Sequence, residues 1–318
     1  MLPRGWSRAM EPLPLVRLTE LAHRTAGNPD IAIGMIDGPV MAEHPGLQGA
    51  RIKETPGGHT VNCVHPGHPA CVHGTFIAGI LVARRGTGAP AICPNCTLCV
   101  HAVFADRPVN GRTPTATPEH LTAGILACTA AGVRVINVSA ALYEPRPDHE
   151  RRLIDALDYA ARRGVLVVVA AGNDRAIGST ALTGHPWVIP VTAYDRAGRP
   201  MGQSNLGHSI GHRGLGGPGD RVISLGPDGG LLAQSGTSAA APFVTGAIAL
   251  LWSLFPDAPA TEVRLAVTAS SRRRTLVPPL LDAAAAFQMM SRRRRHVRRE
   301  RAPRPQALPG PHAWIRPR

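Results

Sequence analysis

Residues 234–251 read QSGTSAAAPFVTGAIALL, a stretch in which small residues give way abruptly to an apolar run with helical spacing. The pattern predicts a helix that begins here, with Ser238 in its opening turn. Free backbone N–H groups and the positive end of the helix dipole favour a negatively charged oxygen at that place, so Ser238 is a candidate nucleophile. The alternative is that Ser235, Thr237 or Ser238 only caps the helix.

Three segments carry a resemblance to one family. Gly236-Thr-Ser-Ala-Ala-Ala-Pro242 resembles the nucleophile motif of the subtilisin-like serine proteases, the S8-type family. Residues 31–38 (IAIGMIDG) are similar to that family's strand ending in the catalytic Asp, and residues 73–81 (HGTFIAGIL) are similar to its His helix. The order Asp, His, Ser is that of subtilisin and differs from that of chymotrypsin and the α/β-hydrolases. The resemblance implies a catalytic triad of Asp37, His73 and Ser238.

The segments between these motifs predict alternating strands and helices. Strands are expected at 31–36, 98–104, 133–139, 164–172 and 187–193, and helices at 15–25, 117–132 and 151–163. Residues 164–172 form a continuous apolar run, which suits a parallel strand buried on both faces. The alternation predicts an α/β fold with a doubly wound, mostly parallel sheet and helices on both faces, which is also the subtilisin-like fold.

Two candidate residues lie at the ends of predicted elements, one of a strand and one of a helix. Asp37 stands at the carboxyl end of its strand, where open α/β sheets place their ligand crevice, although a turn-forming Asp before Gly38 is the alternative. His73 is expected at a helix start facing the sheet edge, a position suited to a general base.

Two further segments belong to the resemblance. Ala171-Gly172-Asn173-Asp174 resembles the family motif whose Asn side chain stabilises the oxyanion, while a turn residue after Gly172 is the alternative for Asn173. The strand at 133–139 resembles the family's substrate-binding strand, whose backbone pairs with an extended peptide. The expected substrate-binding residues are small and permit a roomy pocket: Ser139, Ala140, Ala141, Ala171 and Gly172.

The resemblance implies a serine endopeptidase that hydrolyses peptide bonds in a peptide or protein substrate. Residues 36–40 and 273–287 are similar, more narrowly, to the proteases of cyanobactin-like peptide maturation, so a ribosomal precursor peptide is the expected substrate. Two alternatives are a non-catalytic scaffold of the same fold that binds peptide and a macrocyclising transpeptidase. Only 36 residues separate Asp37 from His73 (73 minus 37), without the inserted helical segment of macrocyclising relatives, which favours hydrolysis.

The six cysteines allow three interpretations. Cys93, Cys96 and Cys99 have a close spacing that suits structural zinc or a redox pair. A disulfide, such as Cys93 to Cys96 or Cys63 to Cys71, is the second interpretation. Reduced thiols are the third, because a reducing cytoplasm keeps cysteines free.

No metal or cofactor is expected. His59, His65 and His68 precede His73 closely, but their spacing matches no ligand pattern, and loop histidines are usually solvated. Calcium is common in the resembled family, yet we find no cluster of carboxylates in the sequence to supply the six to eight oxygens that it takes.

The net charge of +14 is concentrated at the C-terminus, because residues 291–318 contain ten Arg and one Glu. Such a composition cannot build a core. We therefore expect a helix and lead-in at 1–29, a peptidase domain at 30–288 and a disordered basic tail at 289–318. The tail lacks interleaved aromatic residues, which argues against a nucleic-acid partner.

The apolar segments of the sequence predict neither a membrane-spanning helix nor a signal peptide, so no membrane partner is expected. None reaches the roughly 18–20 residues of a membrane span, and the N-terminus has no apolar signal-peptide core. A cytoplasmic location is expected.

Overall fold

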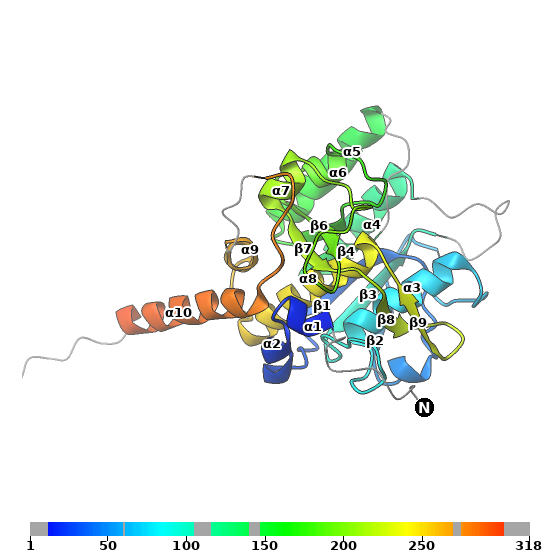
Figure 1. The fold of residues 1–318 in the computed structure, drawn as a ribbon, viewed down its shortest axis with the longest axis horizontal. Helices are drawn as coiled ribbons and strands as arrows, with labels where there is room; N and C mark the ends of the chain where they lie inside the picture. The colour runs from blue at the N-terminus through cyan, green and yellow to red at the C-terminus, as the bar shows by residue number, and fades with distance from the viewer. Residues whose placement is uncertain (1–11, 60, 105–115, 140–146, 270–274, 302–318) are drawn as a thin grey trace, which may run out of the picture.

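The computed structural model describes residues 12–59, 61–104, 116–139, 147–269 and 275–301. Its centre is a parallel sheet of seven strands in the order β2-β3-β1-β4-β5-β6-β7 (Figure 1). These strands are β1 (Ala32–Asp37), β2 (Arg51–Glu54), β3 (Thr97–Ala102), β4 (Val135–Val138), β5 (Leu166–Ala170), β6 (Val188–Tyr194) and β7 (Leu215–Pro218). An antiparallel pair, β8 (Val222–Leu225) and β9 (Leu231–Gln234), precedes the helix that carries Ser238.

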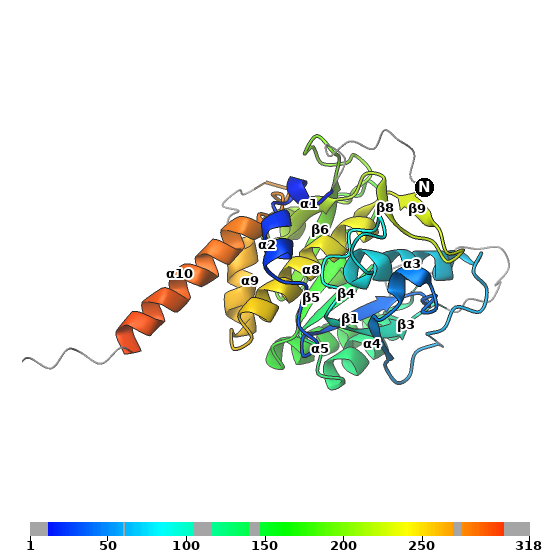
Figure 2. The same cartoon turned by 90° about the horizontal axis from the view of Figure 1, so that it is seen from below.

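Helices cover both faces of the sheet, with α3 (Pro69–Val82) and α8 (Thr237–Leu254) on one face and α4 (Pro118–Ala130) and α5 (Pro147–Arg162) on the other (Figure 2). Further helices between the two ends of the described chain are α6 (Ala181–Gly184), α7 (His208–Arg213), α9 (Ala260–Thr268) and the 3-10 turn η2 (Pro45–Leu47). In β5, Leu166 and Val168 belong to the core under α8, and Val167 and Val169 to the core under α4. Successive strand residues face opposite sides, so one apolar run serves both cores. The predicted doubly wound α/β fold is confirmed.

Helix α8 runs through the middle of the protein. Within the described residues it is the one helix whose length and apolar composition would suffice to cross a membrane. However, 83% of it is buried inside the protein, with Phe243 and Trp252 fully enclosed. Its composition is therefore explained by its position in the core.

The N-terminal segment differs from the prediction of one helix at 15–25. It forms α1 (Pro12–Leu15) and α2 (Thr19–Arg24), separated at Arg17, whose φ is +51°. Val16 and Leu18 are both fully buried. Two residues that are two apart lie on nearly opposite sides of a continuous helix, so the break lets both side chains reach the core.

The C-terminal segment differs from the expected disordered tail at 289–318. Helix α10 (Ala283–Arg301) extends away from the body of the protein through the Arg-rich residues (Figure 1), and residues 302–318 lie outside the described part. Its first turns are buried in the core, and beyond them Arg294 lies 5.0 Å from the Phe255 ring and 3.6 Å from Asp257. An Arg-rich segment needs no core of its own when it continues an anchored helix, because Arg is a good helix former.

The cysteines combine two of the three interpretations. Cys63 and Cys71 form a disulfide, and the other four cysteines are free and buried. Cys93 and Cys96 lie in the core under α8, whereas Cys99 lies in the opposite core with Cys128. Among the described residues no group of three or more His, Cys, Asp or Glu side chains could hold a metal ion. Cys99 faces away from Cys93 and Cys96, so these three thiols do not converge on one point.

Candidate active site

Asp37 ends strand β1 and is fully buried at the carboxyl edge of the sheet. Its Oδ1 atom accepts a hydrogen bond from the Gly38 backbone N–H at 2.7 Å and another from His73 Nδ1 at 2.7 Å. These two bonds hold the carboxylate in one orientation. The sequence therefore placed Asp37 correctly at a strand end, and its partner is the histidine.

Two glycines allow α3 to approach β1 closely enough for this contact. A Cβ added at Gly38 would lie 2.6 Å from the carbonyl carbon of Ala70, and one added at Gly74 would lie 2.7 Å from the carbonyl carbon of Gly38. Real Cβ atoms essentially never come within 3.0 Å of such atoms. Backbone therefore packs directly on backbone, and this closeness brings His73 to Asp37.

His73 is the fifth residue of α3 and lies further into the helix than the sequence predicted. Pro69 occupies the first turn, and His68 caps the helix by accepting a hydrogen bond from the Ala70 N–H. Proline is favoured at this place because the first N–H groups of a helix have no partner within it. The start of α3 was therefore readable from His68-Pro69, four residues before the position that we expected.

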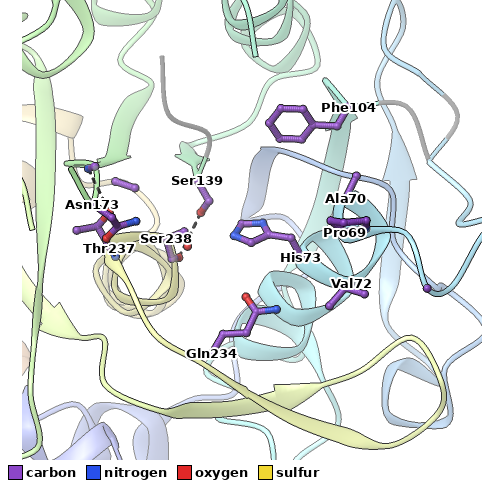
Figure 3. Close-up of a pocket in the computed structure, with 13 residues that line it drawn as sticks. Pro69, Ala70, Val72, His73, Phe104, Ser139, Asn173, Gln234, Thr237 and Ser238 are labelled. Atoms are coloured by element: carbon purple, nitrogen blue, oxygen red, sulfur yellow. Dashed lines mark hydrogen bonds between the residues drawn. The ribbon is translucent and has the colours of Figure 1, made fainter. Parts of the chain in front are cut away.

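The His73 ring is 26% exposed and points toward Ser238 (Figure 3). Burial alone lowers the pKa of the imidazole, but the negative charge of Asp37 and its hydrogen bond raise the pKa by more, so it lies above its ordinary value of 6.5. With Nδ1 donating to Asp37, the neutral ring presents Nε2 as an acceptor. That tautomer suits removal of a proton from a group in the pocket.

Ser238 is the second residue of α8, and Gly236 is the N-cap with no side-chain capping bond. Ser235 accepts a hydrogen bond from the Arg221 N–H, and Thr237 accepts one from the Gly172 N–H. The capping alternative for these serines and this threonine is therefore wrong. The backbone N–H of Ser238 is one of the first four of the helix, which lack partners within it, and it sits at the positive end of the dipole.

Asn173 is attached to the same helix start. Its Oδ1 accepts a hydrogen bond from the Thr237 N–H at 2.9 Å, so the other end of the amide is an N–H₂ donor. Gly172 before it has φ +102° and Gly236 has φ +138°, a region that favours glycine. A Cβ at Gly236 would lie 3.2 Å from the Asn173 amide, so glycine leaves room for this contact.

His73, Asn173 and Ser238 line one cavity of about 550 Å³ (Figure 3). Of the predicted substrate-binding residues, Ser139 and Gly172 also line it. Ala171 is not among the described lining residues; Ala170 and Gly172 on either side of it are, since successive residues of an extended segment face opposite sides. Ala140 and Ala141 lie outside the described residues.

The cavity has walls that the sequence analysis did not assign. The other described lining residues are Gly67, Pro69, Ala70, Val72, Phe104, Ala170, Gln234 and Thr237. Phe104 follows β3, the neighbour of β1, so its place at the carboxyl edge of the sheet was foreseeable. Among the described lining residues, His73 is the one with an imidazole, and none is Asp, Glu, Lys or Arg, so these walls carry no fixed charge.

The subtilase family model (peptidase S8) matches residues 28–292. The chain belongs to this family of serine endopeptidases. Subtilisin DY of Bacillus licheniformis, a relative, is 29% identical over 264 residues, which cover 81% of this chain and 90% of that protein. Fervidolysin of Fervidobacterium pennivorans is 28% identical over 283 residues, which cover 79% of this chain but 39% of fervidolysin. The subtilase chain thus spans well under half the length of fervidolysin.

Solved structures of peptide-maturation proteases share the fold of this subtilase. A point mutant of the protease domain of PatA matches with a TM-score of 0.74 at 29% identity, over 83% of this chain and 96% of that one. The prenylagaramide maturation protease PagA matches with a TM-score of 0.73 at 28% identity, over 86% and 98%. The resemblance to subtilisin-like proteases, nearest to those of cyanobactin-like maturation, is confirmed.

Proposed function

We propose that Asp37, His73 and Ser238 act as a catalytic triad that hydrolyses peptide bonds. His73 Nε2 takes the proton of the Ser238 hydroxyl as its oxygen attacks the scissile carbonyl carbon, and Asp37 stabilises the resulting imidazolium. His73 then gives this proton to the leaving amine, and an acyl-enzyme remains. Water, deprotonated by His73, attacks the acyl-enzyme; the ester bond breaks, and Ser238 recovers its proton.

Asn173 Nδ2 and the Ser238 backbone N–H are proposed to hold the oxyanion of each tetrahedral intermediate. The bond from the Thr237 N–H to Asn173 Oδ1 supports this role, since it orients the amide before substrate arrives. A donor aimed in advance at the developing charge stabilises the transition state without reorganisation.

The observation that carries the triad is the 2.7 Å bond between Asp37 Oδ1 and His73 Nδ1 in a cavity that Ser238 also lines. A fluorophosphonate probe tests it, because the probe labels only an activated serine. We expect the parent protein to be labelled at Ser238 and Ser238→Ala to be neither labelled nor active on peptides. A folded parent that is never labelled would instead support the alternative of a non-catalytic peptide-binding scaffold.

The substrate proposed is a ribosomal precursor peptide that is cut at a leader or recognition sequence. The likeness to PagA and PatA, which are maturation proteases, supports this substrate class. A short peptide encoded beside the gene is the first to test, with products identified by mass spectrometry and Ser238→Ala as the control. If unrelated denatured proteins were cut equally fast, a dedicated processing role would be wrong.

Hydrolysis is proposed over macrocyclising transpeptidation. Between Asp37 and Pro69 the described residues form the turn η2 and the strand β2 but no α-helix, which supports a site open to water. Linear products that carry ¹⁸O from labelled water are expected. Cyclic products without the label would establish the transpeptidase alternative.

The proposed place of this processing is the cytoplasm, where ribosomal precursors are made. Fractionation of cells with an antibody to the protein tests it, and recovery from the culture medium would contradict it. The Cys63–Cys71 disulfide argues against this place, because a reducing cytoplasm keeps thiols reduced. The redox state of the two cysteines in cells is therefore a second test: reduced thiols support the cytoplasm, and an intact disulfide contradicts it.

A further inference from the structure

Pro242 leaves the carbonyl of Ser238 without a partner inside helix α8. In an α-helix each carbonyl accepts a hydrogen bond from the N–H four residues later, and the residue four after Ser238 is Pro242, which has no N–H. A carbonyl in a protein interior needs another donor. The residue proposed as nucleophile therefore depends on a side chain from elsewhere in the fold to complete its backbone hydrogen bonding.

Ser139, at the end of β4, supplies that donor. Its hydroxyl lies 3.4 Å from the Ser238 carbonyl oxygen (Figure 3), and Ser139 is only 8% exposed. The carbonyl can only accept, so the Ser139 hydroxyl must donate its single proton there.

A buried asparagine donates to the Ser139 hydroxyl, and a buried threonine in turn donates to that asparagine. Asn137 Nδ2 donates to Ser139 Oγ at 2.7 Å, and Asn137 Oδ1 accepts from Thr245 Oγ1 at 2.9 Å. Asn137 and Thr245 are both fully buried. The direction of every bond is fixed: the proton of Thr245 points to Asn137, that of Asn137 to Ser139, and that of Ser139 to the Ser238 carbonyl.

We propose that Thr245, Asn137 and Ser139 form a positioning chain for the nucleophile, a role that rests on the proposed function of Ser238. Asn137 pairs with Met35 in β1, the strand that ends at Asp37, so the chain joins that strand pair to the first turn of α8. It thereby sets where Ser238 stands relative to the Asp37–His73 pair. Without Ser139 the Ser238 carbonyl loses its donor, and the first helical turn can rotate.

The test compares removal of a hydroxyl with its conservative return. Ser139→Ala is expected to lower kcat by about 10- to 100-fold with KM changed less than about threefold, since a misplacement on the order of 1 Å can cost 10²-fold. The rate of fluorophosphonate labelling should fall by the same factor. Ser139→Thr, which keeps a hydroxyl, should recover most of both rates.

Thr245→Val provides a second variant that leaves the cavity wall intact. It should lower kcat and the labelling rate in the same direction, by about 3- to 10-fold, and Thr245→Ser should restore them. Thr129→Val is the matched control, because Thr129 is also buried and its hydroxyl donates to the Ile125 carbonyl in α4, on the other face of the sheet. This control should keep the parent kcat while its melting temperature falls as in Thr245→Val.

The acid limb of the pH–rate profile distinguishes a misplaced Ser238 from an altered pKa of the general base, His73. Its midpoint should stay at the parent value in Ser139→Ala and Thr245→Val, because neither touches the Asp37–His73 pair. Unchanged kcat in both variants, or a rise in KM alone, would overturn the positioning chain, and so would a shifted midpoint. Failure of the proposed function looks different: the parent itself would not label, or Ser238→Ala would still cleave peptides.

Discussion

Gly74→Ala isolates the close approach of α3 to the turn that follows β1. The new Cβ would lie 2.7 Å from the carbonyl carbon of Gly38, whereas ordinary van der Waals contacts lie at 3.4–4 Å. Both groups are backbone, so no flexible side chain can yield. Helix α3 must therefore withdraw from the turn by at least about 0.7 Å, the difference between 2.7 and 3.4 Å.

This withdrawal acts on catalysis more than on folding. Added to the 2.7 Å bond between Asp37 Oδ1 and His73 Nδ1, it takes that bond beyond the usual range of about 2.7–3.2 Å for an N–H···O bond and so weakens it. We expect kcat/KM to fall by about 10²-fold, the cost of a misplacement on the order of 1 Å. Overpacking costs about 1–3 kcal/mol, but alanine in place of glycine inside a helix returns about 1 kcal/mol. A typical domain with 5–15 kcal/mol of stability stays folded under that change.

The assay measures kcat and KM on a fluorogenic peptide together with the melting temperature. Gly202→Ala is the matched control, because nothing lies within 4 Å of a Cβ added at Gly202, and it should keep the parent activity. The acid limb of Gly74→Ala should also move to lower pH, since weaker contact with Asp37 lets the pKa of His73 fall. A folded Gly74→Ala protein with the parent kcat and an unmoved acid limb would refute the reasoning.

Four further predictions follow from the site. The kcat/KM of the parent should rise with pH through the raised pKa of His73, and Asp37→Asn should lower both this midpoint and kcat, the latter by about 10⁴-fold. The pKa of His73 is raised in the folded state, so its ion pair with Asp37 stabilises the protein fully below the ordinary imidazole pKa of 6.5. This stabilisation is lost as the pH rises through the folded-state pKa. The difference in unfolding free energy between the parent and His73→Ala should therefore shrink over that pH window. Asn173→Leu should lower kcat by about 10²–10³-fold at nearly constant KM, and an unchanged kcat would remove Asn173 from the oxyanion site. Replacement of both Cys63 and Cys71 by Ser should lower the free energy of unfolding, measured in urea, by about 2–3 kcal/mol. Added reductant should lower it by the same amount in the parent and should leave the double variant unchanged.

The sequence motifs named the candidate site residues, but the cavity around them was only partly foreseeable. Asp37 ends β1 and Ser238 lies in the first turn of α8, places that local sequence features mark, whereas His73 is the fifth residue of α3. Ala171 was expected at the wall, whereas its two chain neighbours Ala170 and Gly172 line the cavity. The direction of a side chain just after a strand end depends on how the backbone pairs with the neighbouring strand. The spacing of residues along the chain does not reveal that pairing.

The amino-acid sequence by itself predicted the doubly wound α/β fold, because strand periodicity and helix starts reflect local backbone needs, and its three motifs carried the family resemblance that implies Asp37, His73 and Ser238. Only the tertiary structure decided that Cys63 pairs with Cys71, that α10 continues through the Arg-rich segment, and that Ser139 donates to the Ser238 carbonyl. The physical reason is that each of these depends on which groups meet in space. Segments far apart in the chain face one another only after the sheet and its two helical layers have packed.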